Sequence, residues 1–145
     1  MNGDSYTDVD LTALVAFHHE SKADVSIVVA PADGRGDCGN VVVDDKGAIL
    51  GFKEKQSFSG SRYLNAGIYV VSRALLYEIP AGVQVSLEEE LFPRWVAEGK
   101  SIKAYVFLGA CVDIGTPDRY RDAQEILANV EAEADLVRGE GEVRK

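Results

Sequence analysis

Two neighbouring stretches of the sequence combine apolar, strand-like residues with side chains that could bind a small ligand. Glu54 and Lys55 end the first apolar run, and Asn65, Ala66 and Gly67 interrupt the second. Asn and Gly are poor strand formers, and a glycine inside a strand often marks close approach of another group to the backbone. The segment therefore predicts a small-molecule site, although a charged hairpin end with a glycine-marked bulge would give the same spacing.

Two acidic residues far apart in the sequence, Asp4 and Asp113, each follow a predicted strand. Ligands of open α/β sheets bind outside the carboxyl ends of the strands, so these two carboxylates are expected on one ligand face. Taken singly, Asp4 could instead be a turn residue and Asp113 a loop acid beside a helix start.

Three motifs, in a fixed order, resemble those of the nucleotidylyltransferases that act on sugar 1-phosphates. They are Phe-Lys-Glu-Lys at 52–55, Asn-Ala-Gly-Ile-Tyr at 65–69 and Val-Asp-Ile-Gly-Thr-Pro at 112–117, and Asn-Gly-Asp at 2–4 precedes them. The family includes guanylyl-, uridylyl- and thymidylyltransferases, and the resemblance covers residues 1–130. It implies transfer of a nucleotidyl group from a nucleoside triphosphate to a sugar 1-phosphate, which gives a nucleotide sugar and pyrophosphate.

The resemblance implies a role for each candidate residue. The implied substrate-binding residues are Glu54, Lys55, Asn65, Ala66 and Gly67. Among these, Glu54 resembles the glutamate that binds sugar hydroxyls and Lys55 the lysine that contacts the sugar phosphate. Asp4 and Asp113 would hold Mg²⁺, which binds proteins through one or two carboxylates while substrate phosphates complete its shell. No residue is assigned as a catalytic acid, base or nucleophile, because this reaction depends mainly on positioning and charge neutralisation.

One part of the family pattern has no counterpart in these 145 residues. The family's first half carries a Gly-rich loop ending in Thr-Arg and then a Pro-Lys pair, which hold the triphosphate and base. We therefore expect an N-terminally incomplete nucleotidyltransferase domain over 1–130, with a charged tail over 131–145, that is inactive as an isolated chain. The alternative is a non-catalytic remnant that binds a sugar phosphate or a partner chain. A metal-dependent hydrolase fits less well, because no positioned nucleophile or His base accompanies the acids.

The elements that must position these residues follow from periodicity and capping signals. Strands are predicted at 25–30, 41–43, 48–54, 63–71 and 102–108, and helices after Asp10, at 73–78, after Ser86 and after Thr116. The turn at 45–47 predicts a hairpin, and the strands at 48–54 and 63–71 are expected to pair. Ser86 and Glu89 form a capping-box pattern. The result is a mixed α/β sheet with flanking helices, and by resemblance a Rossmann-like nucleotide-diphospho-sugar transferase fold.

Composition restricts the partners of the chain. With 145 residues, 46% hydrophobic and 27% charged, it has the size and balance of one globular domain. The net charge of −9 argues against nucleic acid or an anionic membrane as a partner. No signal peptide or spanning apolar run is evident, so a cytoplasmic protein is expected. Strand edges that the family's opening strands would cover predict a homo-oligomer.

Overall fold

The computed structural model describes residues 5–31, 40–53, 63–109, 111–113, 120–121 and 123–124. These residues fall into two units, and each is described by itself. The first unit includes Val9–Leu108, and the second combines Asn2–Asp8 with Gly109–Lys145. The elements of the first unit are α1 (Leu11–Glu20), β2 (Val25–Pro31), β3 (Asn40–Val43), β4 (Ile49–Lys53), β5 (Tyr63–Val71), α2 (Arg73–Leu76), the π-helical turn η1 (Leu87–Leu91), α3 (Phe92–Ala97) and β6 (Ile102–Val106).

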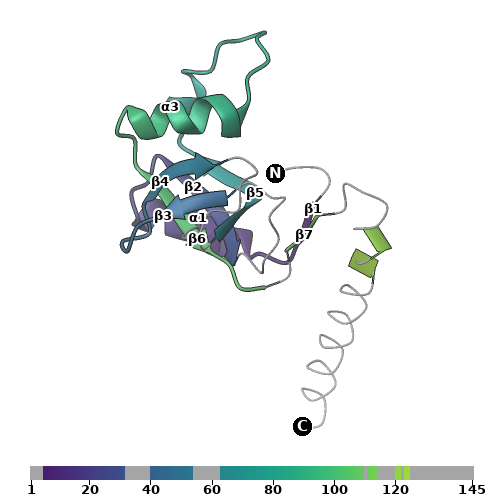
Figure 1. The fold of residues 1–145 in the computed structure, drawn as a ribbon. Coiled ribbons are helices and arrows are strands. Elements are labelled where there is room, and N and C mark those ends of the chain that lie inside the picture. The colour runs from purple at the N-terminus through teal and green to yellow at the C-terminus, as the bar shows by residue number, and fades with distance from the viewer. Residues whose placement is uncertain are drawn as a thin grey trace. The chain divides into compact units, whose positions relative to one another are not determined.

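The first unit contains a five-stranded sheet with the strand order β4-β3-β5-β2-β6 (Figure 1). β2 pairs in parallel with β6 and antiparallel with β5, and β3 is antiparallel to both of its neighbours. This mixed sheet, covered by helices, confirms the predicted fold class. The arrangement also places β5, the strand with Asn65 and Gly67, in the middle of the sheet.

The expected pairing of the strands on either side of the 54–62 segment is wrong, because β3 lies between β4 and β5. The reason is local. The Asp44 carboxylate accepts hydrogen bonds from the backbone N–H groups of Lys46 at 2.8 Å and Ala48 at 2.7 Å, which closes a β3–β4 hairpin. β3 then pairs with β5 through its other edge, so β4 forms the end of the sheet.

Alternate residues of β2 face two different helical layers, because successive side chains of a strand point to opposite faces. Val25, Ile27 and Val29 belong to the main apolar cluster together with Phe92 and Trp95, and all five are fully buried. Figure 1 shows α3, which carries Phe92 and Trp95, across one face of the sheet.

The opposite face of β2 carries a buried polar contact to α1. Ser26 Oγ lies 2.9 Å from His18 Nδ1, and both side chains are buried. Burial, with a smaller contribution from the charge of His19, lowers the pKa of His18 below its ordinary value of 6.5, while Asp24 opposes the shift. His18 is therefore a packed residue of the core.

Helix capping follows the sequence signals with one correction. The Asp10 carboxylate accepts from Thr12 N at 2.8 Å and caps α1, as predicted. Ser86 Oγ accepts from Glu89 N at 3.1 Å, also as predicted, but the acid that reaches back to Ser86 N is Glu90, at 2.9 Å. The wider turn of η1 brings the next residue into the position that a regular helix would give to Glu89.

The second unit contains a two-stranded antiparallel pair of β1 (Ser5–Thr7) and β7 (Cys111–Asp113). Residues 120, 121, 123 and 124 are helical, in the region where a helix was predicted after Thr116. Within the ranges given above, no helix has the length and apolar character needed to cross a membrane.

Candidate functional site

The centre of the candidate site is an irregularity where β5 pairs with β2. Ile27 is opposite Tyr69 and Val29 is opposite Asn65, so β5 uses more residues than β2 over the same interval. Gly67 lies inside this bulge with φ of +72°, a backbone conformation that suits glycine and that other residues rarely adopt. The glycine-marked bulge that the spacing allowed is therefore present. Bulges often re-aim side chains beside binding sites, so this geometry is compatible with a ligand site.

The amide of Asn65 is held by hydrogen bonds at both of its ends. Its Oδ1 accepts from the Gly67 N–H at 3.0 Å, and its Nδ2 donates to the Tyr69 hydroxyl at 3.0 Å. An amide has two N–H hydrogens and two lone pairs on its oxygen. These two bonds therefore fix the orientation of the Asn65 side chain, and among the described residues they use one of its two N–H hydrogens and one of its two lone pairs.

Tyr69 connects Asn65 to an acid on a different element. Its hydroxyl donates to Glu88 Oε1 at 2.5 Å, from β5 to η1. Burial of the ring, together with the bond to Glu88 and its negative charge, raises the pKa of Tyr69 well above its ordinary value. The hydroxyl therefore stays protonated at neutral pH and acts as a donor to the carboxylate.

Sequence reasoning assigned no role to Tyr69 or Glu88. Tyr69 is the last residue of the Asn-Ala-Gly-Ile-Tyr motif, which could have drawn attention to its hydroxyl. Glu88 is one of three consecutive acids in a first helical turn, where the helix dipole favours negative charge, so its charge has an explanation that needs no binding site. No local pattern could have linked the two residues, because their contact depends on tertiary packing.

Aromatic packing ties the bulge to the end of β4. The ring of Phe92 lies 5.0 Å from that of Tyr69 and 5.4 Å from that of Phe52, measured between centroids. Phe52 is near the end of β4, two positions before Glu54 in the sequence. Glu54 and Lys55 lie outside the described residues, but the strand that leads to them belongs to the same aromatic cluster as Tyr69.

Four of the predicted site residues, Asn65, Ala66, Gly67 and Asp113, belong to described strands. Asn65, Ala66 and Gly67 lie together on β5, and Ala66 is buried. In the second unit, Asp113 ends β7 and pairs with Ser5, the residue that directly follows Asp4. Asp4 itself lies outside the described residues. Across the described part of the chain, no group of three or more His, Cys, Asp or Glu side chains could hold a metal ion.

A protein-family model described as "Nucleotidyl transferase" matches residues 1–130. The chain belongs to this family. Two curated nucleotidyl transferases illustrate the relationship. A mannose-1-phosphate guanylyltransferase of Mycobacterium tuberculosis is 34% identical over 139 residues, which are 95% of this chain and 36% of that protein. A UTP–glucose-1-phosphate uridylyltransferase of Synechocystis is 34% identical over 131 residues, which are 87% of this chain and 34% of that protein.

Solved structures show the same fold. HddC from Yersinia pseudotuberculosis, crystallised with GMP-PN, aligns with a TM-score of 0.73 and 24% identity over 88% of this chain and 53% of that chain. A Bacillus anthracis protein described as a putative glucose-1-phosphate thymidylyltransferase aligns with a TM-score of 0.68 and 18% identity over 86% of this chain and 51% of that chain. The chain thus spans about a third of the length of these curated nucleotidyl transferases, 36% and 34%, and about half of the solved chains, 53% and 51%.

Proposed function

We propose that these 145 residues supply the sugar-phosphate and metal half of a sugar-1-phosphate nucleotidyltransferase. The observation that carries the proposal is the bulge of β5, where a positive φ at Gly67 and a fixed Asn65 amide occur in the strand with the Asn-Ala-Gly-Ile-Tyr motif. A covered central strand has no structural need for this interruption. A backbone opened by glycine beside an oriented amide suits a small polar ligand.

The substrate class is a sugar 1-phosphate together with a nucleoside triphosphate. Both curated relatives named above carry a sugar 1-phosphate in their names, whereas their nucleotides differ. In the proposed reaction, an oxygen of the sugar phosphate forms a bond to the α-phosphorus of the triphosphate. The bond from that phosphorus to the β-phosphate oxygen breaks, and pyrophosphate leaves.

Each proposed residue has a physical task in this reaction. Lys55 brings a positive charge to the sugar phosphate, and Glu54 accepts a hydrogen bond from a sugar hydroxyl. The amide of Asn65 offers one donor and one acceptor to the same ligand. These contacts hold the sugar phosphate in place, which lowers the entropic cost of reaching the α-phosphorus.

Asp4 and Asp113 are the proposed ligands of Mg²⁺. The pairing of β1 with β7 supports this assignment at the level of the backbone, because Ser5, which directly follows Asp4, is the partner of Asp113 and partners in an antiparallel pair lie about 5 Å apart. Two carboxylates are also a donor set that suits this hard cation. When bound, Mg²⁺ would neutralise charge on the phosphates.

We propose that the isolated 145-residue chain binds sugar 1-phosphate but does not turn over. A roughly millimolar dissociation constant, about 4 kcal/mol, is expected from one cation and a few hydrogen bonds. Triphosphate should bind more weakly, because these residues include no match to the family's Gly-rich loop and its preorganised amides. The isolated 145-residue chain would therefore lack the loop that binds the triphosphate.

Calorimetric titration with mannose 1-phosphate and glucose 1-phosphate tests the binding, and pyrophosphate release with each nucleoside triphosphate tests the chemistry. The wild type should bind a sugar 1-phosphate without releasing pyrophosphate, and Lys55→Ala should bind it about tenfold more weakly. Equal affinity of Lys55→Ala would remove that lysine from its role. Rapid pyrophosphate release by the isolated chain would contradict the expected inactivity.

A chimaeric protein would distinguish the proposed nucleotidyltransferase half from the alternative, a non-catalytic remnant. The segment of the Synechocystis relative that precedes its aligned region would be fused ahead of residue 1. Metal-dependent pyrophosphate release that is lost in Asp113→Asn would support the proposed function. A folded chimaera that binds both substrates without any release would favour the non-catalytic alternative.

A further inference from the structure

We infer that Glu88 is a positioning residue for the candidate site, because it fixes the Asn65 amide and the bulge at Gly67 through the Tyr69 hydroxyl. Neither the sequence motifs nor the family relationship assigns this acid a role. The inference rests on the proposed function where it concerns the sugar 1-phosphate ligand. The hydrogen-bond chain itself belongs to the described residues and can be tested without any ligand.

The three hydrogen bonds that connect Gly67 to Glu88 all run in one direction. The Gly67 N–H donates to Asn65 Oδ1, Asn65 Nδ2 donates to the Tyr69 hydroxyl, and that hydroxyl donates to Glu88 Oε1. A backbone N–H can only donate and an ionised carboxylate can only accept, so the two ends impose the same direction. Hydrogen bonds that point the same way polarise and strengthen one another.

Of the four residues joined by these hydrogen bonds, Glu88 is the one that carries a charge, and it comes from a different element than the other three. It lies in η1, 19 positions from Tyr69, and its side chain is half-buried. The Tyr69 ring is independently held by its edge contact with Phe92. The position of the Tyr69 hydroxyl is therefore fixed by the ring packing, and the position of η1 determines whether the Glu88 carboxylate is within hydrogen-bond distance of it.

Loss of the acceptor would change what Asn65 offers to a ligand. Without Glu88, the Tyr69 hydroxyl has no carboxylate to receive its hydrogen and can rotate toward Asn65. Two donors, Nδ2–H and O–H, can then face each other across one short contact, and the amide is held firmly only at its Gly67 end. The remaining N–H donor and acceptor of Asn65 are then no longer presented in one fixed arrangement, which weakens recognition of a polar ligand.

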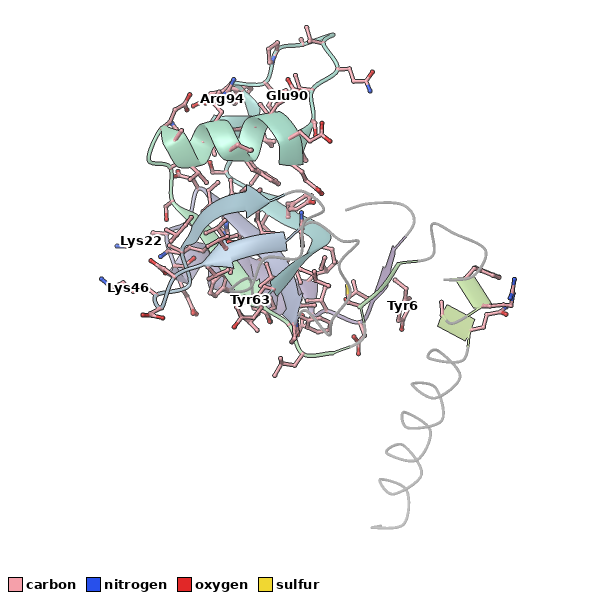
Figure 2. All side chains as sticks on the ribbon, viewed as in Figure 1. Tyr6, Lys22, Lys46, Tyr63, Glu90 and Arg94 are labelled. Atoms are coloured by element: carbon pink, nitrogen blue, oxygen red, sulfur yellow. The ribbon has the colours of Figure 1, made fainter. Side chains whose placement is uncertain are left out.

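The neighbouring acid Glu90 provides a matched control. It lies in the same turn, but its carboxylate accepts from Ser86 N at 2.9 Å and its side chain is exposed. Figure 2 shows Glu90 and Arg94 along the helical segment, on its side away from the sheet. Glu90→Gln removes the same charge as Glu88→Gln and keeps an oxygen acceptor for Ser86.

The first test measures hydrogen exchange of the Gly67 amide by NMR on the chain without ligand. We expect exchange to become about tenfold faster in Glu88→Ala, less so in Glu88→Gln, and to stay unchanged in Glu90→Gln, since one charge-assisted bond corresponds to about that factor. Tyr69→Phe should match Glu88→Ala, and Glu88→Ala should add little in the Tyr69→Phe background. Unchanged exchange in both Glu88→Ala and Glu88→Gln would overturn the inference.

The second test titrates the same variants with mannose 1-phosphate and glucose 1-phosphate. Affinity is expected to fall about tenfold in Glu88→Ala and to recover in part in Glu88→Gln. Additive losses in Glu88→Ala and Tyr69→Phe would contradict action through the hydroxyl. If the wild type binds neither sugar phosphate, the proposed function fails, whereas the exchange measurement still decides whether Glu88 positions the bulge.

Discussion

Gly67→Ala, compared with Gly82→Ala, separates the effect of backbone strain on stability from the effect of the bulge on ligand binding. Gly67 has φ of +72° and is buried within the bulge of β5. An L-residue in the left-handed region costs about 1–2 kcal/mol relative to glycine. With a urea m-value of about 2 kcal/mol/M, the unfolding midpoint should fall by roughly 0.5–1 M. Because the bulge also orients Asn65, sugar 1-phosphate affinity should fall together with stability.

Gly82→Ala is the matched control for this prediction. Gly82 has φ of +74°, and a Cβ added there would meet no atom within 4 Å. It carries a similar backbone cost of about 1–2 kcal/mol but lies in an exposed turn remote from the bulge in sequence. Gly82→Ala should therefore lower the urea midpoint and leave affinity unchanged. Equal affinity losses in the two variants, or full affinity in Gly67→Ala, would refute the reasoning.

Three further predictions concern stability and association. The pKa of His18 is lowered in the folded state, so the unfolded state binds more protons as pH falls below about 6.5. The free energy of unfolding, measured by urea denaturation, should therefore decrease as pH falls through this range, and His18→Gln should remove this pH dependence. Trp95 is fully buried, so Trp95→Ala should cost about 3–5 kcal/mol by urea denaturation, while Leu108→Ala, at 81% exposure, should change stability by less than about 0.5 kcal/mol. The end strand β6 exposes Val106, so sedimentation velocity at high concentration should show a homo-oligomer, and a strictly monomeric profile would contradict this expectation.

The features that could be predicted from sequence are those with local causes. Asp10 caps α1 because its carboxylate reaches amides only two and three positions away. The β3–β4 hairpin follows from a turn in which Asp44 binds the backbone of the residues after it. The unbroken apolar run of β2 signals a strand covered on both faces, and the structure confirms this burial.

The features that could not be predicted depend on which elements meet. The neighbour of β5 is β3 rather than β4, and periodicity alone carries no information on strand order. The switch from Glu89 to Glu90 at the Ser86 cap arises from the wider turn of η1. The acceptor for Tyr69 is set by how η1 packs near the sheet, so Glu88 was indistinguishable in sequence from its acidic neighbours.

The proposed metal site brings together two acids that are far apart in the sequence, Asp4 and Asp113. The register of β1 and β7 puts the partner of Asp113 directly after Asp4. This pairing joins two ends of the sequence, and a search for closely spaced acids could not have linked them. The family resemblance links them, because it implies that both carboxylates would hold one metal ion.

The central claim is that the bulge of β5 contacts a sugar 1-phosphate, and an NMR titration of the ¹⁵N-labelled 145-residue chain tests it most directly. Mannose 1-phosphate, glucose 1-phosphate and inorganic phosphate would be added separately while the Gly67 amide and the Asn65 side-chain amide are followed. We predict saturable shifts of both signals at roughly millimolar sugar 1-phosphate and weaker shifts with phosphate alone. Signals of Gly67 and Asn65 that stay fixed while a sugar phosphate binds elsewhere, or that stay fixed because none binds, would contradict the account.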